Sequence, residues 1–281
     1  MTAAVEVEVP AEVEPGVYDG VDAAIYHSDP VPGGSLSSTG ARKLATECPA
    51  AFKYWLDNQE PYKKEFDFGT AAHKVALGDG PELVLVERDI WNTNEVKAEI
   101  KKIREAGNIP LKQRDLDKVH AMAKALREHP EAAELLEPGS GIAERTVIWN
   151  DRGVWRRIRI DWARHDGTLV DYKSCRSANP ANLGKHVFDY GYHQQQEYYR
   201  DGALEFGLTE LVCPFKFIFQ EKDPPYLVSV IELDAAACNI GRYLNERALN
   251  TYALCRESGE WPGYLTAPLV SLPSWVERQY A

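Results

Sequence analysis

Three neighbouring stretches of the chain alternate apolar and polar residues with a period of two, which is typical of half-buried strands. They cover residues 143–149, 154–163 and 168–173. Turn residues at 150–153 and 166–167 separate them, so the pattern predicts successive hairpins. In the second stretch two sets of side chains take opposite faces, the apolar Ile158, Ile160 and Trp162 and the polar Arg157, Arg159 and Asp161.

On both sides of these strands, apolar residues recur at spacings of three and four, which predicts helices. Before the strands we expect two short helices that meet near Pro49, a turn followed by a helix within 66–77, and mainly helical structure over 95–136 with a break at 107–110. After them we expect a helix over 180–207, strands over 215–220 and 226–233, and a helix over 234–258. This order indicates an α+β domain with an N-terminal helical elaboration.

The same pattern suggests where the domain begins. Residues 1–34 are interpreted as an acidic tail and linker, because Val and Glu alternate near the start and a turn-rich stretch follows at 30–34. Residues 35–281 are then one domain, mainly helical over 35–140, with the core sheet and helix over 141–233 and a C-terminal helix and tail over 234–281. The last residues are rich in Pro and aromatic side chains and are expected to wrap on the surface.

Composition narrows the classes of function. The 281 residues carry 32 Lys and Arg against 43 Asp and Glu, a net charge of −11, which disfavours a protein that coats polyanions without specificity. An enzyme that acts on DNA remains compatible, because its positive surface can be local. The five cysteines lack the close spacing of a zinc knuckle and are odd in number, so a disulfide framework is not expected. No secretory signal or membrane span is visible, and we expect a cytoplasmic protein with no membrane partner.

The predicted hairpins bring together two carboxylates and a lysine. Asp161 would lie close to Asp171 if the turn between their strands is tight, and Lys173 shares a face with Asp171. Magnesium prefers hard oxygen ligands and is often held by one or two carboxylates, while a lysine beside it can orient water and stabilise developing charge. The spacing therefore suits metal-dependent phosphodiester hydrolysis. An exposed hairpin with surface ion pairs would show the same short pattern.

Further segments, in one order between residues 35 and 276, favour the first interpretation. They are LSSTGARKLATECPAAFKYW from Leu36, GTAAH ending at His73, RID at 159–161, VDYKS at 170–174, YHQQQEYYRDG at 192–202 and WPGY at 261–264. Together they resemble the PD-(D/E)xK nucleases, and most of all the exonuclease VIII (RecE) type of phages and prophages. The resemblance implies a restriction-endonuclease-like α/β/α core, in which helices flank a mixed central sheet.

The resemblance also implies residue roles. His73, Asp161 and Asp171 would bind the catalytic Mg²⁺, which Mn²⁺ could replace, together with the backbone carbonyl of Tyr172. Lys173 would position and activate the attacking water. Glu144 on the first strand is either a second-metal or water-bridged ligand, or a solvated strand carboxylate.

Other residues would meet the DNA. Gln195 and Tyr199 would lie on the helix beside the site, where they contact the DNA backbone or brace the strands. Phosphate contacts are expected from basic residues near the motif, namely Arg157, Arg159, Arg176 and Lys185. Arg42 and Lys43 could meet the 5′ end.

The implied activity is digestion of linear double-stranded DNA from its 5′ ends, which leaves 3′ overhangs for homologous recombination. The implied partners are DNA ends, further copies of the chain in a ring, and a RecT-type single-strand annealing protein. The implied setting is the bacterial cytoplasm, with a phage or prophage gene.

Three alternatives stay open. A nuclease with an iron–sulfur cluster would use Cys48 and three closely spaced C-terminal cysteines, but Cys213, Cys238 and Cys255 are far apart, so no cluster is expected. A repair endonuclease of the same fold would share the core motif. A non-catalytic DNA-binding protein could keep the fold, although it would then have little reason to retain the four motif residues.

Overall fold

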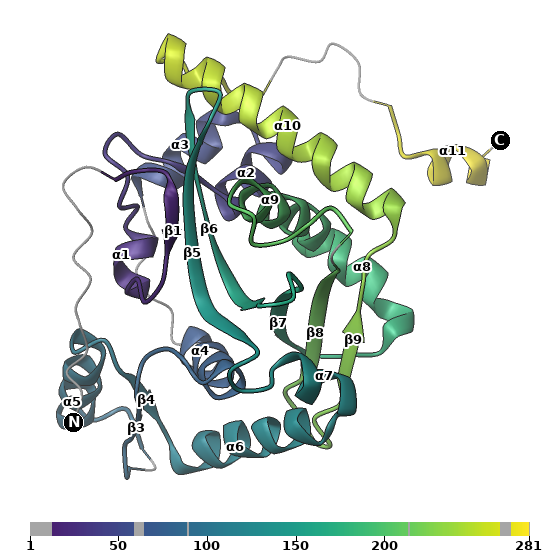
Figure 1. Ribbon diagram of the computed structural model, residues 1–281. Coiled ribbons are helices and arrows are strands. Elements are labelled where there is room, and N and C mark those ends of the chain that lie inside the picture. Colours follow the sequence, from purple (N-terminus) through teal and green to yellow (C-terminus); the bar gives the residue numbers. More distant parts are fainter. Residues whose placement is uncertain (1–12, 59–64, 89, 213, 265–270, 281) are drawn as a thin grey trace.

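The computed structural model describes residues 13–58, 65–88, 90–212, 214–264 and 271–280. Within them, a mixed sheet of seven strands forms the centre of the molecule (Figure 1). Its order is β1 (Gly16–Tyr18), β5 (Gly141–Asp151), β6 (Val154–Arg164), β7 (Leu169–Cys175), β8 (Phe215–Glu221) and β9 (Val228–Ile231), with β2 (Leu36–Ser37) paired to β6. β2–β6 and β7–β8 are parallel pairs and the other pairs are antiparallel.

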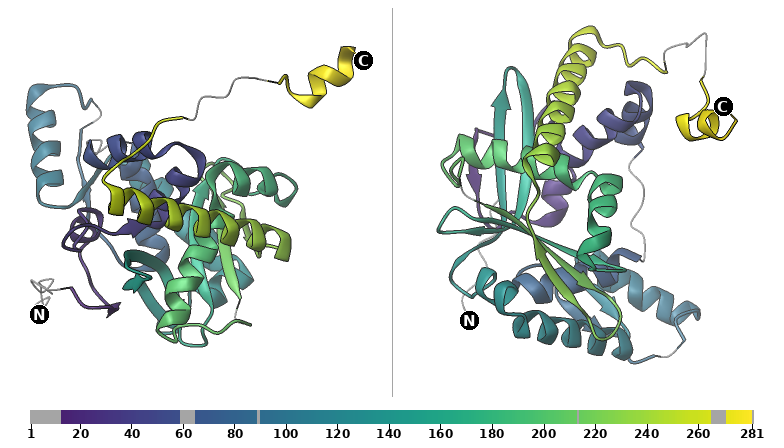
Figure 2. Two further views of the ribbon diagram at one scale, coloured as in Figure 1. Left: turned by 90° about the horizontal axis from the view of Figure 1, so that it is seen from above. Right: turned by 90° about the vertical axis from the view of Figure 1, so that its right-hand side faces the viewer.

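Helices cover both faces of this sheet (Figures 1 and 2). One layer contains α2 (Ser38–Thr46), α3 (Pro49–Asp57), α8 (Pro180–Tyr190), α9 (Tyr192–Glu205) and α10 (Ala235–Ser258). The other contains α4 (Glu65–Leu77), α6 (Gln113–Glu128) and α7 (Pro130–Leu135). The α+β class, the flanked mixed sheet and the helical elaboration before it confirm the predicted fold.

Each helical layer has its own apolar core. Under α9 and α10, the buried side chains of Ile158 and Ile160 pack with those of Tyr198 and Leu249. On the other face, Trp162 packs with residues of α4, α6 and α7. We predicted that the apolar side chains of β6 share one face, but Ile158 and Ile160 pack on one face of the sheet and Trp162 on the other. The change occurs near Asp161, where the ladder between β5 and β6 is also interrupted.

The structure differs from the expected elements in two places. The helix expected over 180–207 is two helices, because Gly191 adopts a left-handed φ of 66° that ends α8 and begins α9. The helical stretch after residue 94 contains α5 (Asn94–Glu105), and its break holds β4 (Ile109–Leu111), which pairs in parallel with β3 (Leu83–Leu85).

The N-terminal stretch is also more ordered than a tail and linker. Residues 13–34 include β1 and α1 (Ala23–His27), and β1 pairs with β5. A three-residue strand carries almost no signal of its own, which is why the pattern missed it. The Val–Glu alternation at 5–9 lies outside the described residues.

At the C-terminus, only part of the expected wrapping is seen. Trp261 stacks on Phe52 of α3, with ring centroids 5.6 Å apart, and the backbone of Ala50 donates a hydrogen bond to the carbonyl of Pro262. The last helix, α11 (Ser274–Tyr280), stands away from the body of the molecule (Figure 2). No helix among the described residues is long and apolar enough to cross a bilayer.

Candidate active site

The hairpin of β6 and β7 positions the two aspartates. Its turn is tight, with the backbone of Gly167 donating to the carbonyl of Arg164. The ladder contains only the pairs Trp162–Val170 and Ala163–Leu169. Beyond them, the Tyr172 N–H donates to Oδ2 of Asp161, at 2.8 Å, and the strands diverge. The Asp161 carboxylate thus replaces a backbone carbonyl as the acceptor for the Tyr172 N–H. This hydrogen bond holds Asp161 beside Asp171.

Asp171 is fully buried between two donors. Lys173 Nζ lies 2.5 Å from its Oδ1, and Gln195 Nε2 donates to its Oδ2 at 2.7 Å. Burial raises the pKa of Asp171 to about 6, and the charge of Asp161 adds to this rise while Lys173 opposes it. Burial would lower the pKa of Lys173, but Asp171 and Asp161 outweigh it and raise that pKa. The lysine is therefore a charged donor at the floor of the site.

His73, on α4, joins Asp161 to Glu144. Its Nε2 lies 2.9 Å from Asp161 Oδ2, and its Nδ1 lies 3.0 Å from Glu144 Oε1. Burial favours the neutral imidazole, but the two carboxylates prevail and raise the pKa of His73 to about 10. Burial likewise would raise the pKa of Asp161, yet His73, Lys173 and the Tyr172 N–H lower it. The environments thus move the pKa values of the two aspartates in opposite directions.

Glu144 is not a solvated strand carboxylate. Its side chain lies between His73 and Arg159, whose Nε contacts Glu144 Oε2. Its φ is +51°, a left-handed conformation rare outside glycine, and the ladder between β5 and β6 skips both Glu144 and Asp161. Backbone strain of this kind concentrates at functional sites, where surrounding contacts hold it in place.

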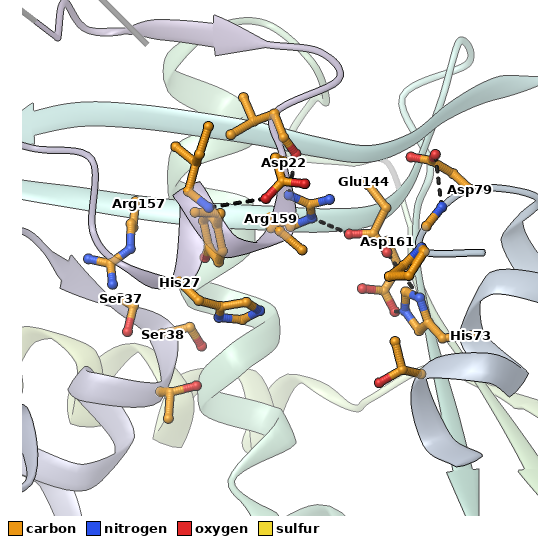
Figure 3. Close-up of a pocket in the computed structure, with 18 of the residues that line it drawn as sticks. Asp22, His27, Ser37, Ser38, His73, Asp79, Glu144, Arg157, Arg159 and Asp161 are labelled. Atoms are coloured by element: carbon orange, nitrogen blue, oxygen red, sulfur yellow. Dashed lines mark hydrogen bonds and ion pairs between the residues drawn. The ribbon is translucent and has the colours of Figure 1, made fainter. Parts of the chain in front are cut away.

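A cleft of about 1540 Å³ opens beside this cluster. Figure 3 shows His73, Glu144 and Asp161 toward one end and Ser37 and Ser38 toward the other. The latter two lie at the N-terminus of α2, where Ser37 caps the helix through the N–H of Gly40. Ser38 is buried, and its Oγ has no hydrogen-bond partner in the described part of the chain.

The N-terminal segment forms one wall of the cleft, which the sequence interpretation missed. Arg159 Nη1 donates to the carbonyl of Val21 at 2.7 Å. The ring of Tyr26, on α1, lies within 6 Å of the guanidinium groups of Arg157 and Arg159. Arg157 is buried and lies 2.7 Å from Asp29 Oδ2. These contacts and the pairing of β1 with β5 hold the segment here, and none of them has a local signature in the sequence.

The remaining residues expected to bind DNA have different surroundings. Tyr199 is buried at the cleft, and burial raises its pKa. Arg176 is exposed just after β7. Lys185 is exposed on α8 and is paired with Asp189. Arg157 and Arg159 line the cleft, but both guanidinium groups are engaged within the protein.

One contact of the cluster was not anticipated. Arg42 Nη1 donates to Oε1 of Gln195 at 3.3 Å and to the carbonyl of Tyr190 at 3.2 Å. The sequence marked Arg42 only as a candidate for the 5′ end of DNA. Nothing in it identifies Gln195 as a partner 153 positions away.

The donor set fits a hard divalent cation. Carboxylates, an imidazole and a strand carbonyl are ligands that Mg²⁺ and Mn²⁺ accept, and the buried aspartates already need positive charge beside them. Here the charged His73 and Lys173 supply it. Among the described residues, no group of three or more His, Cys, Asp or Glu side chains stands in metal-binding geometry. His73 would have to release a proton before Nε2 could act as a ligand.

Comparisons with known proteins place the chain in a family of domains. Residues 37–267 match the family model described as a PDDEXK-like domain of unknown function (DUF3799). The crystal structure of a "Putative exonuclease" from Eubacterium rectale aligns with a TM-score of 0.63 and 13% identity, over 89% of this chain and 96% of that one. An alkaline exonuclease from Laribacter hongkongensis gives a TM-score of 0.28 and 15% identity, over 69% and 95%. No curated protein matches the sequence.

Proposed function

Because the chain belongs to the family of PDDEXK-like domains (DUF3799), we propose that it is a metal-dependent exodeoxyribonuclease. Its substrate is linear double-stranded DNA, which it digests from 5′ to 3′. The observation that carries this proposal is the ion pair of the buried Asp171 with Lys173, beside Asp161 at the edge of a large cleft. Two carboxylates whose environments differ, next to a charged lysine, suit hydrolysis of a phosphodiester.

We assign the metal ligands to His73, Asp161, Asp171 and the carbonyl of Tyr172, with Glu144 in a second or water-bridged position. A divalent ion bound there supplies a water of lowered pKa and charge to stabilise the leaving oxygen. Lys173 Nζ orients the attacking water and stabilises negative charge on the phosphate. Gln195 holds the Asp171 carboxylate in place through its amide N–H.

Phosphate binding is assigned to groups that remain available around the cleft. Arg176 is exposed beside the end of β7. The unpartnered Ser38 Oγ and the N-terminus of α2 face the cleft and suit the phosphate of a 5′ end. Arg157 and Arg159 would contact DNA only by exchanging their present partners, whereas Tyr199 contributes its ring to the wall.

The experiment uses wild type and Lys173→Ala on linear duplex DNA labelled at either end, with closed circular duplex as control. We expect wild type to release nucleotides from the 5′ ends of linear DNA in Mg²⁺ and to cleave nothing in EDTA. The cleavage rate of Lys173→Ala should be at least about 100-fold lower. Lys124→Ala is the matched control, because that lysine is exposed on α6, pairs with Glu128 and does not line the cleft. Thermal unfolding of each variant shows whether a variant that does not cleave DNA is still folded.

Each other outcome points to a different function. Cleavage of circular DNA would identify an endonuclease of the same fold. No cleavage in Mg²⁺ or Mn²⁺ by folded protein would favour a non-catalytic DNA-binding protein.

We further propose a cytoplasmic ring of several copies that works with a RecT-type annealing protein, on the resemblance to phage exonuclease VIII. A ring would let an acidic chain line its channel with basic side chains. Light scattering of the purified protein tests the ring, and a monomer at assay concentration would exclude it. Co-purification with an annealing protein encoded beside its gene tests the partner.

A further inference from the structure

An exposed tyrosine stands at the junction of α8 and α9, next to the candidate active site. Tyr190 is 59% exposed, yet its ring is held by two aromatic neighbours. It is stacked with Tyr192, with centroids 5.7 Å apart and planes 19° apart, and it contacts His186 at 4.4 Å. His186 is in turn supported edge-on by Phe219 of the sheet. The ring is therefore preorganised while part of its surface faces solvent.

Two contacts connect this ring to the catalytic cluster. Lys173 Nζ lies 5.0 Å from the ring centroid of Tyr192, on which Tyr190 stacks. Arg42 binds the carbonyl of Tyr190 with the same Nη1 that contacts Gln195. One ring, that of Tyr192, therefore lies between the exposed ring and the lysine that we assign to orienting the attacking water.

We propose that Tyr190, supported by His186 and Tyr192, is a stacking platform for a nucleobase of the DNA strand held at the site. This inference rests on the nuclease function proposed above. The proposed exonuclease acts at a strand end, where the terminal base can unpair and leave the duplex. A base freed in this way exposes its faces, and stacking on a fixed aromatic ring stabilises it whatever its identity. Such a contact suits an enzyme that must digest every sequence.

The same helix supplies a matched control. Phe188 is 69% exposed and stacks on His193, with centroids 5.9 Å and planes 14° apart. Two positions along a helix correspond to a rotation of about 200°, so Phe188 and Tyr190 leave α8 on opposite sides. Replacing either residue with alanine removes an exposed aromatic ring of similar size. Only the ring of Tyr190 is connected through Tyr192 to Lys173.

The test compares wild type, Tyr190→Ala, Tyr190→Phe and Phe188→Ala as full-length proteins. One readout is the rate of nucleotide release from linear duplex DNA against DNA concentration. The other is the fluorescence of 2-aminopurine at the 5′-terminal position, which stacking quenches, measured in EDTA so that no DNA is cut. We expect Tyr190→Ala to raise KM about 5- to 150-fold and to abolish quenching. Tyr190→Phe and Phe188→Ala should stay within about twofold of wild type.

The outcomes separate this inference from the nuclease proposal. If wild type and Tyr190→Ala cleave DNA alike and quench the fluorophore alike, the platform is wrong while the nuclease stands. If wild type cleaves no DNA, the nuclease proposal fails, and fluorescence alone decides the platform. Quenching that depends on Tyr190 would then support it, and quenching absent in wild type would overturn it.

Discussion

The amide of Gln195 is held between a partner that only donates hydrogen bonds and one that only accepts them. The guanidinium of Arg42 donates to Oε1, and the ionised carboxylate of Asp171 accepts from Nε2. A flipped amide would lose both bonds, so Arg42 fixes the orientation of the group that holds Asp171. We therefore interpret Arg42 as a positioning residue, one step removed from the reacting atoms.

Arg42→Ala should lower kcat on linear duplex DNA by about 10- to 100-fold, because hydrogen bonds to charged groups contribute about 1.5 to 3 kcal/mol. KM should change less, since the residue acts through Gln195. Arg42→Lys should restore part of the rate, whereas Lys53→Ala, which removes an exposed pair with Asp57 on α3, should have little effect. An Arg42→Ala enzyme with a normal kcat would contradict the positioning role.

At the scale of elements, the junction of α8 and α9 depends on Gly191. Its φ of 66° is left-handed, and a Cβ built there would lie 3.0 Å from Cδ of Arg42. Gly207 offers a matched comparison, because its φ is 64° and a Cβ there would meet nothing within 4 Å. The two glycines therefore share the same backbone requirement but differ in crowding.

We expect Gly207→Ala to lower the free energy of unfolding by about 1 to 2 kcal/mol, the usual penalty of a left-handed alanine. Gly191→Ala should lower it further and should also reduce DNA cleavage, because displacing Arg42 disturbs Gln195. Urea denaturation and initial rates measure both effects. If the two variants lose the same free energy of unfolding and cleave DNA at the same rate, then displacing Arg42 has no effect on Gln195.

The elements that the sequence predicted are those whose signal is local. The alternation along 154–163 and 168–173 and a short turn are enough to predict Asp161 beside Asp171. The split of α8 from α9 was missed, because one glycine in a helical pattern does not reveal a left-handed φ. The partners of Arg42 and Arg157 could not be found either, since packing among segments more than 100 positions apart selects them.

At the scale of the whole molecule, the N-terminal segment completes the domain. Asp29 accepts hydrogen bonds from the backbone and hydroxyl of Ser35 and is the counter-charge of the buried Arg157. It therefore connects residues before α2 to the central sheet. This segment lies wholly before the stretch that matches the family model, which begins at residue 37.

Asp29→Ala should lower the free energy of unfolding by about 3 to 5 kcal/mol, because it leaves Arg157 buried without its counter-charge. Asp19→Ala is the control, since Asp19 pairs with Arg145 at a half-exposed position and should contribute about 1 kcal/mol or less. Chemical denaturation compares the two. Similar small losses would mean that the N-terminal segment is dispensable for the fold.

The bond from the Tyr172 N–H to Asp161 bears on how such a domain could evolve. The carboxylate that we assign to metal binding also satisfies a strand amide where the β6–β7 ladder stops. A lineage released from selection for cleavage could replace Asp161 with asparagine and keep an acceptor there, but alanine would leave a buried amide unpaired. Descendants that lost activity should therefore tend to retain a polar residue at this position, long after its chemistry had ceased to matter.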